Sequence, residues 1–426
     1  MLRKLVLFIG LLSVVSLISD TKISYAANDP SFACLDAAGP TQVVTGFYGT
    51  GKFEPETAPF KKFDARTASF EIPYDISWGK VVLRGSSDSH DMCWAGGYVT
   101  AALDWHDLDI SWDQSKHGYD QSGTYRNTAA VESFHNRTTW TGLHIYNVHD
   151  GIRTTDSNDN WRIQHVWLDY IRDDCVENDH IHSGEIYDVL FDGCYVGFSS
   201  RPSSTGYSGI NTIIKMNKML MRMEPMPYPY KWDTKSDPTF TVPGYGVTPF
   251  GYGNTFKLDN GNEPNFEITN SIFLHEYDSE KDIFPPIAKV TVCANNTLIW
   301  LGDPTKAPFS LLDQINAKFP GCLILITGKV QGKTLWKDKV ADWHQRHPDV
   351  GVNRKPAVPG EYTWPRYQGS VIGDADGDGK VDGKDYLIWL SHYNQPTTNG
   401  VKDGDFDING NVNGLDYLIW LSNYGS

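Results

Sequence analysis

Two loops near the C-terminus carry oxygen-bearing side chains at the spacing of a calcium-binding loop. Counted from Asp374 and from Asp405, both copies fill the ligand positions and place glycine where the loop turns sharply. The expected ligands are Asp374, Asp376, Asp378, Lys380, Asp382 and Asp385, then Asp405, Asp407, Asn409, Asn411, Asn413 and Asp416, with Lys380 and Asn411 offering backbone carbonyls. The sequence therefore predicts two bound Ca²⁺ ions.

A second set of carboxylates lies in the middle of the chain. Glycoside hydrolysis needs two carboxyl groups, one as acid and one as base or nucleophile, and crowded like charges keep one of them protonated. The expected catalytic residues are Asp150, Asp173 and Asp174, and the expected substrate-binding residues near them are Arg153, Arg172, Glu177 and His180. The same carboxylates could instead bind a further Ca²⁺, with an arginine as base, or serve only as turn residues.

The elements that position these carboxylates repeat every 23 residues. The segments GLHIYNVHDGIRT, HVWLDYIRDDCVE and DVLFDGCYVGFSS align so that their apolar residues fall in register. Strand-like alternation at a fixed period predicts a right-handed parallel β-helix, in which equivalent residues of adjacent coils lie about 4.8 Å apart. On this register Asp150 stacks on Asp173. The register also stacks Gly151 on Asp174 and Thr154 on Glu177. A β-sandwich with chance periodicity is the alternative.

The rest of the chain is typical of a mainly β protein, with 13% aromatic residues and frequent glycine and proline. One short helix is expected at residues 310–319. Residues 216–254 alternate proline with aromatic side chains, among them Tyr230 and Trp232, which could stack on sugar rings or belong to a covering loop. The proline-rich residues 355–370 are predicted to be a linker.

The first 26 residues predict a signal peptide, because a basic start precedes an apolar run and a small-residue cleavage site. That run is too short to span a bilayer, and no later segment is long and apolar enough. We therefore expect a secreted protein, extracellular or attached to the cell surface. The net charge of −15 argues against nucleic acid as a partner.

Six cysteines would then lie in a compartment that permits disulfides. Cys175 and Cys194 are 19 residues apart, which is out of register with the repeat. We therefore predict that a disulfide between Cys175 and Cys194 is less favoured than one between Cys293 and Cys322. The latter would close a loop around an apolar strand.

Residues 371–426 resemble a dockerin module, in which a calcium loop followed by a single helix occurs twice. In this chain no helix-forming segment precedes either loop, as the resemblance requires. The resemblance implies that the module binds a cohesin domain of a scaffold or surface protein. Leucines three residues apart in each helix are expected to form the buried face: Leu387, Leu390, Leu418 and Leu421.

The region around Asp150-Gly151 and Asp173-Asp174 resembles two motifs of polygalacturonases and, more broadly, β-helix carbohydrate-active proteins such as pectate lyases. The third polygalacturonase motif has histidine where this chain has Phe198. The resemblance implies polysaccharide as substrate for a glycoside hydrolase or polysaccharide lyase. The alternative is a non-catalytic glycan-binding or structural protein. The expected domains are 27–354, a parallel β-helix, and 371–426, a small α-helical calcium-binding dockerin.

Overall fold

The computed structural model describes residues 30–57, 61–73, 78–85, 91–101, 128–155, 159–202, 207–224, 226–227, 250–251, 254–259, 261–276, 282–351, 373–376, 380–397, 400–406 and 410–425. The predicted signal peptide and linker lie outside these residues, as do Tyr230, Trp232, Asp378, Asp407 and Asn409.

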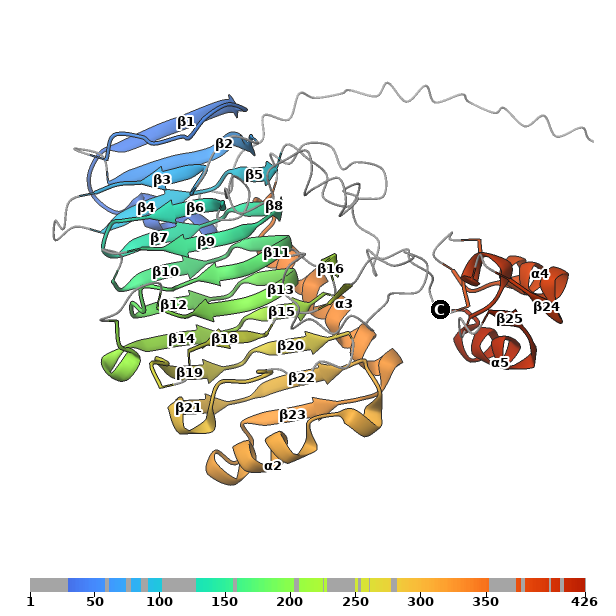
Figure 1. Ribbon diagram of the computed structural model, residues 1–426. Coiled ribbons are helices and arrows are strands. Elements are labelled where there is room, and N and C mark those ends of the chain that lie inside the picture. The colour runs from blue at the N-terminus through green and yellow to red at the C-terminus, as the bar shows by residue number, and fades with distance from the viewer. Residues whose placement is uncertain are drawn as a thin grey trace, which may run out of the picture.

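The first part of the chain winds into stacked coils of parallel strands, a β-helix-like arrangement that runs from blue to orange in Figure 1. One ladder holds β1 (Thr41–Tyr48), β2 (Lys62–Ile72), β4 (Met92–Ala95), β7 (Thr138–Thr141), β10 (Trp161–Gln164), β12 (Gly184–Tyr187), β14 (Ile213–Asn217), β19 (Asn265–Thr269) and β21 (Val290–Ala294). The pairing of every one of these strands is parallel, so the β-sandwich alternative is wrong.

Two further ladders complete each coil. The second holds β5 (Tyr98–Ala101), β8 (His144–Val148), β11 (Trp167–Glu177), β13 (Leu190–Ser200), β15 (Leu220–Met223), β20 (Ile272–His275), β22 (Asn296–Trp300) and β23 (Leu323–Ile326). The third holds β3 (Val81–Leu83), β6 (Ala129–Ser133), β9 (Asp150–Thr154), the ends of β11 and β13, and β18 (Phe256–Leu258). A short antiparallel pair, β16 (Met226–Pro227) and β17 (Phe250–Gly251), lies outside the ladders.

The predicted 23-residue repeat is confirmed where the coils are most regular. Leu168 of β11 pairs with Ile145 of β8 before it and with Phe191 of β13 after it. All three side chains are fully buried in one continuous apolar core. The chain turns at residues with positive φ that recur at the same spacing, among them His165 and Asp188. The repeat is thus a repeat of corners as well as of core residues.

The register changes at the next corner, in the middle of β11. The Asp173 N–H donates to the His149 carbonyl, as the expected stacking of Asp173 on Asp150 requires. Between Asp173 and Val176 the strand contains one extra residue, and Glu177 pairs with Arg153. The expected stacking of Thr154 on Glu177 is therefore wrong. A single bulged residue accounts for the shift, since it leaves one strand a residue longer than its partner.

Three disulfides are present, and two of them join the pairs ranked from the sequence. Cys293–Cys322 is confirmed, and Cys34–Cys93 ties the 3-10 helix η1 (Pro30–Asp36) to β4. Cys175–Cys194 is also bonded, with its Cα atoms 5.9 Å apart, so the lower preference given to it was wrong. The bulge in β11 and the bend at Gly193 bring both side chains into the interior across the corner, which spacing along the chain does not reveal.

Two helices follow the later coils. The predicted short helix is confirmed as α2 (Phe309–Lys318). An 18-residue helix, α3 (Lys329–Arg346), was not expected, because its apolar residues stand among many charged ones. Trp336 and Trp343 of α3 are buried against outward-facing residues of the second ladder, including Leu190 and Leu220. The remaining 3-10 helices are η3 (Gly209–Asn211), η4 (Ile287–Lys289) and η5 (Pro304–Lys306).

The C-terminal unit contains α4 (Gly383–His392), β24 (Gln395–Pro396), η6 (Gly400–Asp403), β25 (Asn411–Val412) and α5 (Gly414–Asn423). Its two helices are bound reciprocally: Trp389 Nε1 donates to the Asn413 carbonyl at 2.9 Å, and Trp420 Nε1 donates to the Asp382 carbonyl at 3.0 Å. The tryptophans form the core of the unit.

The expected burial of the leucines in this unit is wrong. Leu387, Leu390, Leu418 and Leu421 are 47–62% exposed. Both faces of these short helices are apolar, and the indoles occupy the buried one because their N–H groups reach carbonyls of the other repeat. Among the described residues, no helix combines the length and apolar character needed to cross a bilayer.

Candidate carboxylate site and calcium loops

The carboxylates predicted to be catalytic meet at the corner between the second and third ladders. Asp150 begins β9, and Asp173, Asp174 and Glu177 follow the bend of β11 on the next coil. One oxygen from each of Asp150, Asp174 and Glu177 lies within 4.8 Å of the others. Glu177 is the most accessible of the three, with 16% of its side chain exposed. The structure thus brings together carboxylates that the sequence predicted to lie close together on adjacent coils.

Two cations hold these carboxylates. Arg153 donates from Nη2 to Asp150 Oδ2 at 2.6 Å and from Nε to Glu177 Oε2 at 2.7 Å. Lys257 Nζ donates to both oxygens of Asp174, at 2.7 and 2.9 Å. Arg153 was predicted as a substrate-binding residue, but here it bridges two site carboxylates. Lys257 was missed, because it lies 83 residues beyond Asp174 and outside the stretch where the 23-residue repeat can be read.

The remaining predicted residues surround this network. His149 lies 3.4 Å from Asp150 and 3.8 Å from Asp173 through its two ring nitrogens. Arg172 is buried beside Asp173 in β11. The Nδ1 atom of His180 lies 3.4 Å from the Thr154 carbonyl, and its ring meets Tyr207 edge-on at 5.2 Å.

The environment drives the pKa values of the clustered carboxyl groups apart. Burial opposes ionisation of Asp150, but the neighbouring His149 and Arg153 outweigh it and hold the pKa of Asp150 well below its usual range. Burial raises the pKa of Glu177 to about 8, against the pull of Arg153 and with help from Asp150 and Asp179. Burial also raises the pKa of Asp174 well above its ordinary value, despite Lys257. The protonated form is thus favoured at Glu177 and the ionised form at Asp150, a difference that acid–base catalysis uses.

The first C-terminal loop brings three of the predicted calcium ligands together. One oxygen from each of Asp374, Asp376 and Asp385 lies within 4.8 Å of the others. Asp385 Oδ1 accepts the Ala375 N–H at 2.7 Å, and its Oδ2 accepts the Asp382 N–H at 2.7 Å. The carboxylate of Asp385, the last ligand position of the loop, therefore ties the loop to the start of α4 by hydrogen bonds. Three converging carboxylate oxygens are the donors that a hard cation prefers, so these residues fit Ca²⁺.

The second loop has equivalent hydrogen bonds to its last carboxylate. Asp416 Oδ1 accepts the Phe406 N–H at 2.7 Å, and Asp416 Oδ2 accepts the Asn413 N–H at 2.8 Å. Asp405 Oδ2 accepts the Gly410 N–H at 2.9 Å across the loop. Asp405 and Asp416 occupy the same first and last positions as Asp374 and Asp385, and both are buried. The described part of the second loop thus has the same architecture as the first.

A further ion at the β-helix corner fits less well than an ion in the loops. Arg153 already binds Asp150 and Glu177, and Lys257 already binds Asp174. A divalent cation would have to displace one of these positive groups to reach the same oxygens. The third calcium ion therefore stays a prediction.

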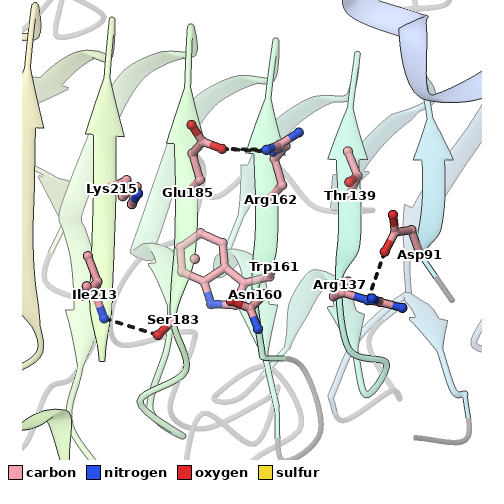
Figure 2. A pocket seen from close by; sticks show the side chains of 11 residues that line it. Asp91, Arg137, Thr139, Asn160, Trp161, Arg162, Ser183, Glu185, Ile213 and Lys215 are labelled. Carbon is pink, nitrogen blue, oxygen red and sulfur yellow. Dashed lines mark hydrogen bonds and ion pairs between the residues drawn. The ribbon is translucent and has the colours of Figure 1, made fainter. Parts of the chain in front are cut away.

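A shallow groove of about 440 Å³ lies on a different face, over the first ladder (Figure 2). Basic and acidic side chains both line it along the coils. Arg137 pairs with Asp91 at 2.9 Å, and Arg162 pairs with Glu185 at 2.9 Å, as Figure 2 shows. These side chains join neighbouring coils in a row of ion pairs, and the groove does not contain the clustered carboxylates.

The comparisons with known proteins do not extend this description. No family model, no curated protein and no solved structure matches the chain. The interpretation of the two sites therefore rests on their own geometry.

Proposed function

We propose that the protein is a secreted glycoside hydrolase built on a right-handed parallel β-helix and carried by a C-terminal dockerin to a cohesin-bearing partner. The observation that supports the hydrolase best is the corner at Asp150 and Glu177. Two carboxyl groups from adjacent coils approach each other there, and their pKa values are displaced in opposite directions.

Glu177 is the proposed acid, because it is protonated near neutral pH and is the most accessible of the group. It would give its proton to the glycosidic oxygen as the bond to the sugar breaks. Asp150 is ionised and would attack the anomeric carbon. The close approach of the carboxyl oxygens, within 4.8 Å, favours a retaining reaction, since inverting enzymes separate the two groups by about 6.5–9.5 Å.

A lyase receives less support from the same residues. A lyase base must be unprotonated to remove a proton from the sugar ring. The carboxylates around Arg153 and Lys257 overcome the effect of burial and raise both of their pKa values above the ordinary range. Both groups therefore stay charged, and neither is suited to act as a base.

The calcium loops and the exposed leucines support the docking module. Bound Ca²⁺ would supply folding energy to a unit with a small core, as metal does in other small domains. Exposed leucines on both helices form apolar surface that a soluble unit would cover with a partner. A cohesin domain is the partner that the loop-and-helix repeat indicates.

A non-catalytic glycan-binding or structural role is the second candidate. The burial of Asp150, Asp173 and Asp174 favours it, because each is at most 5% exposed and held in an ion-pair network. On this hypothesis the network stabilises a corner of the β-helix, and polysaccharide binds without being cleaved.

The test is product release from a panel of plant and microbial polysaccharides. Glu177→Gln and Asp150→Asn should each lower turnover by at least about 10²-fold, because acid–base catalysis alone contributes that much. Glu185→Gln, in the groove over the first ladder, is the matched control and should keep full turnover. Full activity in both site variants would refute the assignment, and binding without any products would favour the second candidate.

A further inference from the structure

Trp78 stands out among the large apolar side chains near the carboxylate corner. Its side chain is 51% exposed, and its backbone has a φ of 71°. A positive φ is rare for a bulky residue and is retained where the surrounding structure fixes it. The next residue supplies that constraint, since the Gly79 N–H donates to Glu132 Oε2 at 3.1 Å. A Cβ atom at Gly79 would lie only 2.6 Å from the Glu132 Cβ, so the backbone there cannot shift far.

The indole of Trp78 lies over the residue that connects the site carboxylates. The Arg153 guanidinium carbon is 5.9 Å from the centre of the Trp78 ring. Glu132, Arg153 and Glu177 occupy paired positions on three successive coils of the third ladder. Trp78 therefore reaches from the coil of β3 across to the coil of β9, and the part of its ring not turned to Arg153 is open to solvent.

The charges beneath Trp78 indicate which ligand suits this position. Arg153 already binds Asp150 and Glu177, and Lys257 already binds Asp174. The carboxylate of an acidic sugar would have to break one of these buried pairs and would meet several carboxyl groups. A neutral sugar ring carries no such cost and can lay its C–H face on an indole.

We infer that Trp78 is a stacking platform for a neutral pyranose ring of the polysaccharide, in a subsite beside Asp150 and Glu177. This inference rests on the proposed function for the identity of the site. It assigns a binding role to a residue that takes no part in the acid–base chemistry.

The test is binding of neutral and acidic oligosaccharides, measured by calorimetry on the full chain with calcium present. Turnover of the corresponding polysaccharides is measured in parallel. Trp78→Ala should weaken binding of the neutral oligosaccharide at least about tenfold, as truncation of a well-placed tryptophan commonly does, and Trp78→Phe should retain part of it. Phe47→Ala is the matched control, because Phe47 is an aromatic of similar exposure (56%) on β1.

Failure of this inference is distinguishable from failure of the proposed function. Normal affinity in Trp78→Ala refutes the platform even if the polysaccharide is cleaved. Tenfold tighter binding of acidic than of neutral sugars refutes the ligand class. Trp78-dependent binding without product release supports the platform and refutes the hydrolase. Absence of binding to every member of the panel refutes both.

Discussion

Arg153 and Asp150, three residues apart in β9, form a buried ion pair with Nη2 and Oδ2 at 2.6 Å. The same guanidinium reaches Glu177 on the next coil at 2.7 Å, so one cation binds carboxyl groups from two coils. The arrangement stabilises the corner and also fixes which carboxyl group stays ionised. Structure and proposed chemistry therefore depend on the same residue.

Replacing Arg153 by methionine should destabilise the β-helix-like unit strongly. The substitution keeps a long apolar side chain but leaves the ionised Asp150 buried without its cation and removes a hydrogen-bond donor from Glu177. Removing one partner of a buried ion pair typically costs about 3–5 kcal/mol. Urea denaturation measures the change. Arg162→Met is the control: Arg162 also pairs with a glutamate on the next coil, but it is half exposed, and its loss should cost less than about 1 kcal/mol. Equal effects would contradict this account of the corner.

The pH dependence of stability should reflect buried, protonated glutamates. Burial raises the pKa of Glu224 to about 8 against the pull of Arg222, and the nearby Glu276 and Asp192 add to the rise. An unfolded glutamate titrates near 4.5, so between these values the folded chain binds more protons. Stability from this group is complete below about pH 4.5 and is lost as the pH rises towards 8, by up to about 1.4 kcal/mol per pH unit.

Glu224→Gln isolates this contribution, because the amide keeps the shape and cannot ionise. Urea midpoints between pH 5 and pH 8 should fall less steeply in Glu224→Gln than in the parent chain. Glu185→Gln, on the surface groove, should leave the parent slope unchanged. Equal slopes in Glu224→Gln and the parent chain would show that Glu224 is ionised in the folded state.

The sequence predicted the coils best where every turn has the same length. From His144 to Cys194, along the first two ladders, the corners and the core residues both repeat, so the register there follows from counting. A one-residue bulge in β11 does not interrupt the run of strand-like residues, and nothing in the local pattern shows it. The partner of Glu177 and the bond between Cys175 and Cys194 both depend on that bulge.

The residues of the site that come from distant coils could not be located by counting along the repeat. Lys257 reaches Asp174 only because β18 continues the third ladder after a long insertion. In the C-terminal helices, leucine and tryptophan offered two possible apolar faces of similar spacing. Which face is buried was decided by indole hydrogen bonds between the repeats, an interaction that spacing within one helix does not contain.

The disulfide between Cys175 and Cys194 should stabilise the coils, because it closes a loop in the unfolded chain and lowers the conformational entropy of that state. Cys175 and Cys194 enclose 19 residues, for which the chain-entropy estimate is about 3 kcal/mol. Peptide mapping without reduction should recover this pair together with Cys34–Cys93 and Cys293–Cys322. The Cys175→Ala/Cys194→Ala double variant should unfold at lower urea concentration. Recovery of any other pairing would contradict the coil register at this corner.

Calcium should stabilise the C-terminal unit in a concentration-dependent way. A ligand that binds only the folded state adds about 2.7 kcal/mol when present at a hundred times its dissociation constant. In calorimetry of the full chain, one transition should therefore move to lower temperature in EDTA, and Asp374→Asn should reduce the shift. Asp338→Asn, on the exposed side of α3, is the control. Identical transitions with calcium and with EDTA would refute the two metal sites.

The exposed leucines of α4 and α5 should carry the binding to cohesin. Leu387 and Leu418 occupy equivalent positions in the two repeats, and both project from helices whose buried faces are filled by tryptophan. The Leu387→Asp/Leu418→Asp double variant should bind no member of a cohesin panel that the parent chain binds, because a charge in the centre of an apolar interface is left without a partner. Its calcium-dependent transition should remain, since neither leucine lies in the core. Val330→Asp, which changes an exposed apolar residue of α3, should bind as the parent does. If the double variant keeps the parent affinity, the partner binds elsewhere and the leucine surface is not the docking site.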